Sequence, residues 1–349
     1  MQRILKKAGH EAHVWSMNGM RMVVLRDGGR VLGLYAPDSE ESFFWNNPRI
    51  FDDARLVWKE RWPNPGGDRC WLSPVCTIGN THGNPAGRYN IPWRVDPGYH
   101  DVERWKGGDM RLCNVGKIFL HKTRKKDTFA LERYLSWTEN PLRHMEEDRT
   151  RDLSYAGYSQ KTRLESFSCN KNNLSIWNIL QLPIGGEIVV PVYGRSSLVR
   201  STLGIKNTDF LKVSDGKIQI KAGGENDCLI SIPPQMSTGR IGYVRQEGRQ
   251  WILVVRNFQV NPSGEYMNCF SGSTGKPGYA VQCRSVSDGE ASHVELHHHV
   301  PANSFQVIYD TSQTWCFRGS RKNILHAAAC LTGYELVPSS GIWHRTGGL

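Results

Sequence analysis

The sequence predicts an all-β protein. Turn-forming residues are plentiful, with 35 Gly and 17 Pro among 349 residues, and they are spread along the whole chain. Short runs rich in β-forming residues lie between them, and helical periodicity is scarce. The 12 Trp residues add many aromatic groups, which is typical of a concave, aromatic-lined site on a β scaffold. A chain of this length can bury a large core.

The predicted strands follow one another at short intervals, separated by Gly, Pro, Asn and Asp. The first two form a hairpin through the Asp27-Gly28-Gly29 turn. The full set is Met20–Leu25, Val31–Tyr35, Ser42–Trp45, Met110–Val115, Lys117–His121, Thr128–Trp137, Ser159–Ser168, Leu174–Leu182, Glu187–Tyr193, Lys217–Lys221, Cys228–Ile232, Arg240–Arg245, Trp251–Phe258, Tyr279–Arg284, His293–Val300 and Phe305–Tyr309.

Residues 62–100 are predicted to be mainly loop. Turn formers dominate Trp62–Trp71, and a second segment from Thr81 to Trp93 carries Arg, His, Tyr and Trp. A long structured loop with such side chains is typical of a functional segment on a rigid scaffold. A Pro-rich surface crossover is the alternative.

Two short helices are predicted, at Asp52–Trp58 and Lys322–Leu331. No repeat of 20 to 50 residues is visible, which argues against a propeller or a solenoid. No clean linker divides the chain. We therefore expect one large antiparallel double sheet over residues 1–317, followed by a short helix and an irregular tail over residues 318–349.

Net charge, cysteine content and hydropathy limit the partners and the cellular location that we expect. The net charge is +11, but basic residues are mostly scattered among acids, and the densest run, Lys122–Lys126, is typical of a hairpin turn. We therefore expect no nucleic-acid partner. Nine Cys at irregular spacing, with no C-x-x-C pair, indicate reduced, buried thiols. No apolar run has transmembrane length and residues 1–9 lack a signal-peptide pattern, so a cytoplasmic protein without a membrane partner is expected; an exported protein given without its leader would look the same.

Common catalytic motifs are missing from the sequence. It contains no G-x-G-x-x-G, no Walker A loop, no H-E-x-x-H and no G-x-S-x-G. These absences argue against Rossmann oxidoreductases, P-loop enzymes, zincins and α/β-hydrolases.

One late stretch, His293–Pro301, concentrates groups that bind protons or metals. If it is a strand, its side chains alternate between two faces, which places His293, Glu295, His297 and His299 together. Val294 and Leu296 then face a core. Either this is the floor of a polar pocket or it is a solvated strand face.

The order of several motifs resembles that of the galactose mutarotase-like superfamily of β-supersandwich proteins, which includes aldose epimerases. The resemblance spans roughly residues 20–317 and is closer to uncharacterised members than to true aldose epimerases. It rests on four places: the Asp27-Gly28-Gly29 hairpin leading to Trp45-Asn46-Asn47-Pro48, the Gly66-Gly67-Asp68-Arg69-Cys70-Trp71 segment, His82-Gly83 ahead of Arg88 and Trp93, and Val294-Glu295-Leu296 ahead of Pro301, Ser304 and Trp315.

The resemblance implies a large antiparallel β-supersandwich and proton transfer at the anomeric carbon of a sugar. It implies that Glu295 is the general base and that a histidine donates a proton to the ring oxygen. The family's catalytic histidine usually lies mid-chain, where this sequence has Trp177, Asn178 and Gln181 instead. The expected donor is therefore His82 or His100.

Other side chains complete the expected site. Guanidinium groups of Arg69 and Arg88 suit sugar hydroxyls or an anionic group. Stacking on a sugar ring is expected from one or more of Trp71, Trp93 and Trp177, and strand parity places Gln181 on the same face as Trp177. The substrate-binding set is Arg69, Trp71, Arg88, Trp93, Trp177 and Gln181.

Several functions remain open from sequence alone. The leading one is a mutarotase- or epimerase-like protein that binds a sugar or oligosaccharide, which the positive charge allows to be anionic. A polysaccharide lyase or glycoside hydrolase on the same scaffold, or a non-catalytic sugar-binding module, are the alternatives. No cofactor is required, but His293, His297 and His299 are also candidate ligands for a divalent metal.

Overall fold

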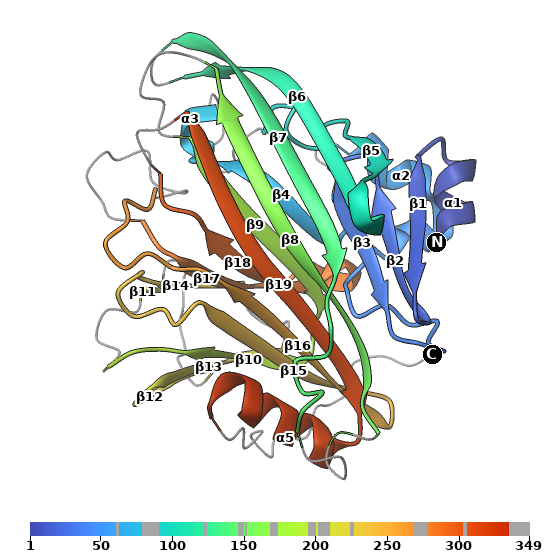
Figure 1. Cartoon of the computed structure of the whole chain (residues 1–349), viewed down its shortest axis with the longest axis vertical. Coiled ribbons are helices and arrows are strands. Elements are labelled where there is room, and N and C mark those ends of the chain that lie inside the picture. The colour runs from blue at the N-terminus through green and yellow to red at the C-terminus, as the bar shows by residue number, and fades with distance from the viewer. Residues whose placement is uncertain are drawn as a thin grey trace.

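The computed structural model describes residues 1–60, 63–78, 91–121, 124–145, 150, 152–167, 174–194, 200–201, 210–223, 227–267, 278–302 and 306–334. Two antiparallel sheets face each other in this part of the chain, which confirms the predicted all-β double sheet (Figure 1). No helix within these ranges combines the length and the apolar character needed to cross a membrane.

The first sheet has nine strands in the described residues. In spatial order they are β1 (Ala12–Met17), β2 (Met20–Leu25), β3 (Arg30–Tyr35), β4 (Asp68–Ser73), β9 (Ser175–Pro183), β18 (His293–His299), β17 (Val281–Val286), β14 (Cys228–Ile232) and β11 (Arg200–Ser201).

The second sheet has ten strands in the same described ranges. In spatial order they are β12 (Leu211–Ser214), β13 (Lys217–Ala222), β10 (Gly186–Pro191), β15 (Arg240–Glu247), β16 (Gln250–Phe258), β19 (Val307–Gly319), β8 (Ser154–Ser166), β7 (Lys125–Trp137), β6 (Met110–Leu120) and β5 (Asp101–Arg104).

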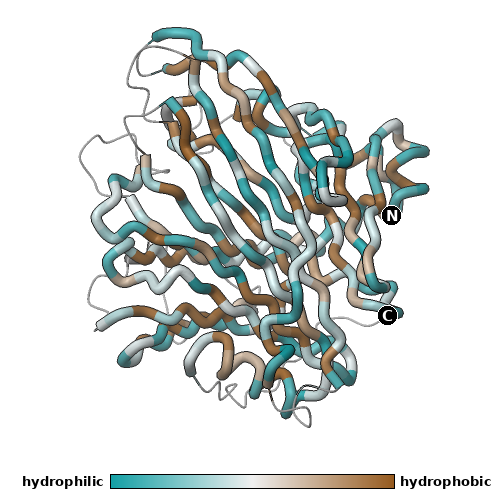
Figure 2. Tube along the Cα trace, in the orientation of Figure 1, coloured by the Kyte–Doolittle hydropathy of each residue, from teal (hydrophilic) through white to brown (hydrophobic). Residues whose placement is uncertain are grey.

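The main core fills the space between the sheets. Residues such as Val24, Leu180 and Leu296 from the first sheet meet Val254 and Cys316 from the second, all fully buried. Period-two alternation explains this, because alternate residues of a strand face the same side and most of the inward positions that meet here are apolar. Figure 2 shows the resulting alternation of hydrophobic and hydrophilic residues along the strands.

Polar side chains also cross between the sheets. Asp68 on β4 accepts hydrogen bonds from Tyr158 on β8 and from Arg256 on β16, the latter at 2.6 Å. His298 on β18 lies 3.1 Å from Asp310 on β19. Buried polar and charged groups are costly unless they are paired, and these pairs join the two sheets across the core.

Helices cover parts of both outer faces. The helices α1 (Gln2–Lys7) and α2 (Arg49–Lys59) pack on the outward side of β2 and β3, where Leu25 and Leu32 are buried against them. Helix α5 (Arg321–Thr332) packs against Leu253 and Phe317 of the second sheet. The outward faces of β4, β9, β18 and β17 carry the polar site described below. Two 3₁₀ turns, η1 (Lys106–Gly108) and η2 (Gly289–Ala291), and the short α3 (Val75–Ile78) complete the described elements.

Most predicted elements are present, with some differences. The predicted strands at Met20–Leu25 and Cys228–Ile232 have the same bounds in the structure, and both predicted helices exist. The prediction of a strand at Ser42–Trp45 is wrong. Phe43 and Phe44 are buried in the core, but the segment that carries them is irregular. The two strands predicted between Met110 and His121 are one strand, β6.

The predicted loop at 62–100 contains a central strand, β4. Its start requires two glycines. Gly66 and Gly67 have φ angles of +101° and +80°, and a Cβ on Gly67 would lie 2.4 Å from the Val31 carbonyl oxygen. Only glycine adopts this backbone at such close approach. The Gly-Gly pair therefore brings Asp68 onto Val31 of β3 and places Arg69 on the outward face.

Candidate functional site

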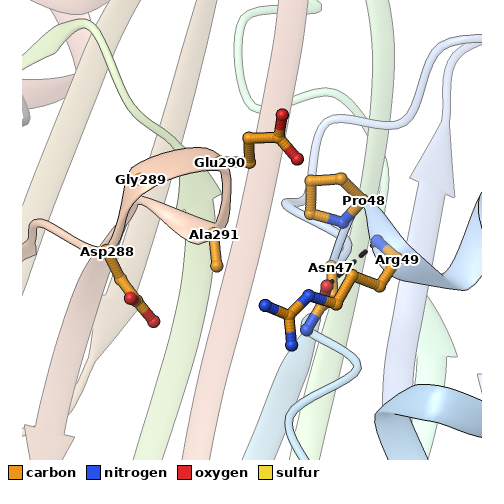
Figure 3. Close-up of a pocket in the computed structure, with 7 residues that line it drawn as sticks. All are labelled: Asn47, Pro48, Arg49, Asp288, Gly289, Glu290 and Ala291. Atoms are coloured by element: carbon orange, nitrogen blue, oxygen red, sulfur yellow. Dashed lines mark hydrogen bonds between the residues drawn. The ribbon is translucent and has the colours of Figure 1, made fainter.

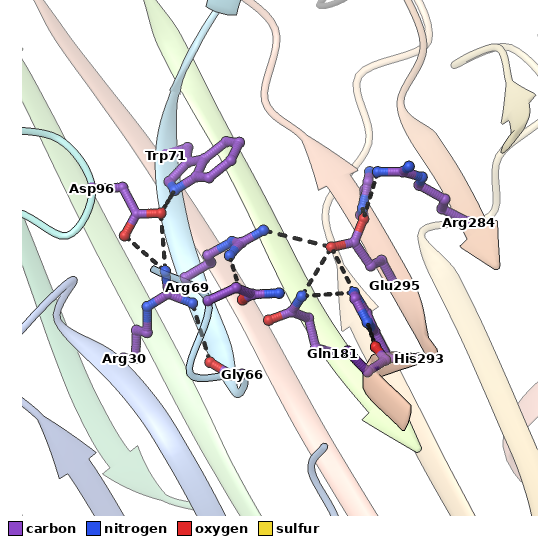
Figure 4. A network of polar contacts seen from close by, with 12 residues as sticks. Arg30, Gly66, Arg69, Trp71, Asp96, Gln181, Arg284, His293 and Glu295 are labelled. Carbon is purple, nitrogen blue, oxygen red and sulfur yellow. Dashed lines mark hydrogen bonds and ion pairs between the residues drawn. The ribbon is translucent and has the colours of Figure 1, made fainter. Parts of the chain in front are cut away.

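Strand register brings the predicted site residues together on the outward face of the first sheet. Glu295 on β18 lies opposite Gln181 on β9 and Arg284 on β17. One row along, Ile179 lies between Arg69 and His297. In the next row, Trp177 lies between Trp71 and His299. Residues from β4, β9 and the consecutive strands β17 and β18 thus form one polar surface of the sheet, although most of these side chains are themselves buried (Figure 4).

Glu295 is the centre of this surface, and its side chain is only 5% exposed. Its Oε1 atom accepts from Gln181 Nε2 at 3.0 Å and lies 3.5 Å from Arg69 Nη2. These contacts are drawn in Figure 4. A buried carboxylate with charged and amide donors around it is held in one position.

The second carboxylate oxygen has its own partners. Glu295 Oε2 lies 3.1 Å from His297 Nε2 and 3.8 Å from Arg284 Nη1. His293 Nε2 lies 3.4 Å from Oε1. Burial alone would raise the pKa of Glu295, but the hydrogen bonds with His293 and His297 hold this pKa well below its ordinary value. Glu295 is therefore an anion at neutral pH.

Arg69 is almost completely buried beside this anion. Its Nη1 donates to Asn64 Oδ1 at 3.0 Å, and its guanidinium lies 4.4 Å from the ring centroid of Trp71. Burial and the nearby Arg30 lower its pKa to about 10, against the attraction of Asp96 and Glu295. Arg69 nevertheless stays cationic at neutral pH and balances Glu295.

A second ion pair supports Arg69 and Trp71 from behind. Arg30 Nη2 donates to both oxygens of Asp96, at 2.7 and 2.9 Å, and Arg30 Nη1 donates to the Gly66 carbonyl at 3.2 Å. Trp71 Nε1 donates to Asp96 Oδ2 at 3.0 Å. These contacts fix the Trp71 ring and the Gly66 turn as one rigid support for Arg69.

Aromatic rings form the other end of the surface. Trp177 meets Trp71 edge to face at 5.3 Å and stacks on His299 at the same centroid distance. His299 Nε2 lies 2.9 Å from Gln282 Oε1. Burial lowers the pKa of both His297 and His299, and for His299 the neighbouring His297 and His298 lower it further. Both rings are therefore neutral at pH 7, although Glu295 opposes the shift of His297.

The structure places two predicted residues away from Glu295. His100 packs against the Gly29 turn, and burial and the charge of Arg133 lower its pKa to about 3. Trp93 is 52% exposed and pairs with Tyr99 and Arg94 instead. His82 and Arg88 lie outside the described residues.

Sequence reasoning missed several members of the site: Arg30, Asn64, Asp96 and Arg284. Arg284 lies within a predicted strand that directly precedes the strand of Glu295, and consecutive strands often pair, but its exact register opposite Glu295 is not readable from the sequence. Asn64 and Asp96 lie in irregular segments, so strand parity could not place them. Only the spacing of Asn64 before the Gly-Gly turn hints at a role near Arg69.

The histidines of β18 hold hydrogen-bond partners on neighbouring strands. Gln181 Nε2 lies 2.9 Å from His293 Nε2, whose other nitrogen, Nδ1, lies 2.8 Å from the Ala291 carbonyl oxygen. Within the described ranges, no group of three or more His, Cys, Asp or Glu side chains is arranged to hold a metal ion.

A cavity of about 310 Å³ lies next to this surface, and its lining residues are Asn47, Pro48, Arg49, Asp288, Gly289, Glu290 and Ala291 (Figure 3). Ala291 is the residue whose carbonyl contacts His293. The ring of Trp45, two residues before Asn47, stacks on His293 at 4.3 Å. The cavity therefore adjoins the His293 end of the polar surface.

The two sheets and the outward polar surface define a β-supersandwich with an acidic centre, Glu295, on one sheet. Comparison with solved structures gives the same class. A galactose mutarotase-like protein from Lactobacillus casei ATCC 334 has a TM-score of 0.50 at 8% identity, over 88% of this chain and 99% of that one. The protein thus has the galactose mutarotase-like fold.

Two further solved structures are similar at lower scores. A putative aldose 1-epimerase from Escherichia coli K12 has a TM-score of 0.49 at 10% identity, over 89% of this chain and all of that one. Galactose 1-epimerase from Lactobacillus acidophilus NCFM has a TM-score of 0.41 at 8% identity, over 89% and 95%. No model of a known protein family and no curated protein matches the sequence.

Proposed function

We propose that the protein binds a sugar against the outward face of β4, β9 and β18 and transfers a proton at the anomeric carbon, as an aldose epimerase does. The observation that carries this proposal is the buried Glu295 carboxylate between Arg69, Gln181, His293 and His297. The fold, shared with a galactose mutarotase-like protein, is the reason to test sugars first.

The proposed reaction is an exchange of anomers. The Glu295 carboxylate takes the proton of the C1 hydroxyl while the bond from C1 to the ring oxygen breaks, and an acid protonates the ring oxygen. Rotation about the bond from C1 to C2 and the reverse steps then give the other anomer, so no proton is gained or lost overall.

The low pKa of Glu295 fits a base only if the sugar changes its surroundings. With its present hydrogen bonds the carboxylate is a weak proton acceptor. A sugar hydroxyl that replaces the bond from His297 or His293 would remove part of the stabilisation of the anion. The pKa of Glu295 would then rise toward its ordinary value in the complex.

The proton donor is a separate question. His82 is the candidate from sequence, and it lies outside the described residues. His100 has Gly29 and Arg133 as neighbours and a pKa lowered to about 3, which makes it a poor donor at neutral pH. We therefore favour His82 as the donor.

An uncharged sugar fits this surface better than an anionic one. Among the residues that the structure describes, the positive groups nearest Glu295 are Arg69 and Arg284, and Arg284 also pairs with Asp227 at 3.2 Å. Two guanidinium groups thus face two carboxylates, which leaves little excess positive charge for a carboxylate or sulfate of a ligand.

The strongly lowered pKa of Glu295 also favours a second candidate, a sugar-binding module without catalysis. In that case Glu295 is a fixed hydrogen-bond acceptor for sugar hydroxyls. The two candidates differ in turnover and share the binding surface.

Magnetisation-exchange NMR on purified protein with glucose, galactose, mannose and xylose separates them. Exchange of α and β anomers faster than in buffer supports the epimerase-like function. Saturable binding without faster exchange supports the binding module. If no aldose of a broad set binds and none exchanges its anomers faster than in buffer, both candidate functions are contradicted.

A further inference from the structure

The cavity beside His293 is large enough for one small ligand. Its volume of about 310 Å³ is near the lower end of the ~300–1,000 Å³ that is usual for ligand pockets. One wall is the segment Asn47–Arg49 at the start of α2, and the other is the turn Asp288–Ala291 ahead of β18.

The walls carry both positively and negatively charged side chains. Figure 3 shows the Glu290 carboxylate beside Pro48, and the Arg49 guanidinium beside Asn47. Arg49 pairs with Glu60 at 2.7 Å, so its charge is already balanced. Asp288 and Glu290 are exposed and have no ion pair among the described residues.

This charge pattern selects the chemistry of the ligand. Two unbalanced carboxylates repel an anion such as a uronate or a sulfate ester. Carboxylates and a guanidinium next to each other suit vicinal hydroxyl groups, which both donate and accept. An uncharged, hydroxyl-rich ring of monosaccharide size meets both requirements.

Each wall is connected to Glu295 by hydrogen bonds. On the strand side, the Ala291 carbonyl contacts His293 Nδ1, and His293 Nε2 contacts Glu295. A ligand that shifts the 288–291 turn therefore acts on the environment of the carboxylate.

The other wall reaches the same carboxylate by a different route. Asn47 Nδ2 donates to the Asn64 carbonyl at 3.2 Å, and Asn64 Oδ1 accepts from Arg69 Nη1 at 3.0 Å. Arg69 in turn lies 3.5 Å from Glu295. The cavity and the acidic centre are thus two parts of one connected region.

We propose that this cavity is a second subsite, which binds an uncharged sugar unit of an oligosaccharide whose neighbouring unit occupies the Glu295 surface. The proposal rests on the proposed sugar-binding function and adds the substrate class: a neutral disaccharide or longer glycan in place of a free monosaccharide. It assigns Asp288, Glu290 and Arg49 to ligand binding at the cavity.

Calorimetric titration with defined sugars tests this subsite. The probes are galactose and glucose against the disaccharides lactose, cellobiose and maltose. The wild type is expected to bind at least one disaccharide about 10-fold or more tightly than either monosaccharide, which corresponds to about 1.4 kcal/mol and is within what one further hydrogen bond to a charged group contributes.

Paired variants locate the effect. The double variant Asp288→Asn/Glu290→Gln is expected to lose that ~10-fold advantage and to keep monosaccharide affinity, because its side chains do not contact Glu295. The control, Glu103→Gln, changes an exposed carboxylate on β5 of the other sheet and should bind like the wild type.

The outcomes separate the two proposals. If monosaccharides bind but no disaccharide binds more tightly, or if the double variant binds all sugars as the wild type does, the subsite is wrong and the sugar-binding function stands. If the double variant weakens both kinds of sugar equally, the cavity is no separate subsite. If no sugar binds to the wild type, the proposed function itself fails, and the subsite with it.

Discussion

The Nε2 atom of His297 lies 3.1 Å from Oε2 of Glu295, two residues earlier on the same strand. A carboxylate only accepts, so this nitrogen carries the proton and donates it. Both side chains are buried, and burial keeps the His297 ring neutral while the hydrogen bond helps to keep Glu295 anionic. The pair is thus fixed in one protonation state at neutral pH.

Acid should destabilise the protein well before ordinary carboxylates titrate. His100, His297 and His299 all have pKa values below that of an unfolded histidine, about 6.5, and that of His100 is about 3. The unfolded chain then binds more protons than the folded one as pH falls below ~6.5. Their contribution to stability is complete above that pH and is lost as pH falls toward the folded-state values.

Urea denaturation at pH 7.5, 6.5, 5.5 and 4.5 measures this effect. For His100 alone, the free energy of unfolding should fall by up to ~1.4 kcal/mol per pH unit below pH ~6. In a His100→Gln variant, the free energy of unfolding should fall less steeply with decreasing pH, by the slope that corresponds to about one proton. The same unfolding free energy at pH 7.5 and 4.5 would contradict this account.

Arg69 and Glu295 should be strongly coupled. Removing one partner of a buried ion pair typically costs ~3–5 kcal/mol, because the other charge stays buried without compensation. Arg69→Met and Glu295→Gln are therefore each expected to lower the unfolding free energy. Arg69→Met leaves a buried anion, and Glu295→Gln leaves a buried cation.

The double variant tests the coupling directly. Arg69→Met/Glu295→Gln should be less destabilised than the sum of the single variants, by ~0.5–3 kcal/mol as for other contacting pairs. Chemical denaturation of the four proteins gives this coupling energy. Additive effects within error would show that the two side chains do not stabilise each other.

The Gly67 turn should tolerate no side chain. In Gly67→Ala, the new Cβ meets the Val31 carbonyl oxygen at 2.4 Å, in addition to the cost of a positive φ. Gly185→Ala is the matched control: its φ is +97°, but no atom lies within 4 Å of the new Cβ. Positive φ costs roughly 1–2 kcal/mol for alanine, so the control should lose about that much and Gly67→Ala clearly more. Equal losses in thermal or urea denaturation would show that the close approach of β3 does not matter.

The sequence predicted part of this architecture for clear physical reasons. Cys228–Ile232 and Met20–Leu25 are compact runs of β-forming residues between turns, and such local patterns determine a strand. The alternation of β18 was also visible, because Val294 and Leu296 are apolar on one side, and both are in the core between the sheets.

Other features depend on the fold as a whole. Asp68–Ser73 directly follows a run of turn formers and is therefore predicted as loop; it is a strand in which Asp68 is paired with Arg256 across the core and Gly67 fits against β3. The sequence does not show the register between strands or the path of irregular segments, so Arg284 and Asn64 were not found. For the same reason it could not show that His100 lies against Gly29 while Arg69, Trp71, Trp177 and Gln181 share a face with Glu295. Their roles with a sugar stay predictions.

The exchange rate between sugar anomers in wild type and in Glu295→Gln tests the central claim most directly. Magnetisation-exchange NMR with the sugar that the wild type acts on gives both rates, and circular dichroism confirms that the variant is folded. If Glu295 accepts the anomeric proton, the variant should be slower by ~100-fold or more, as for the loss of a general base, and Glu103→Gln should match the wild type. Equal anomer exchange rates in a folded Glu295→Gln protein and in the wild type would contradict the account.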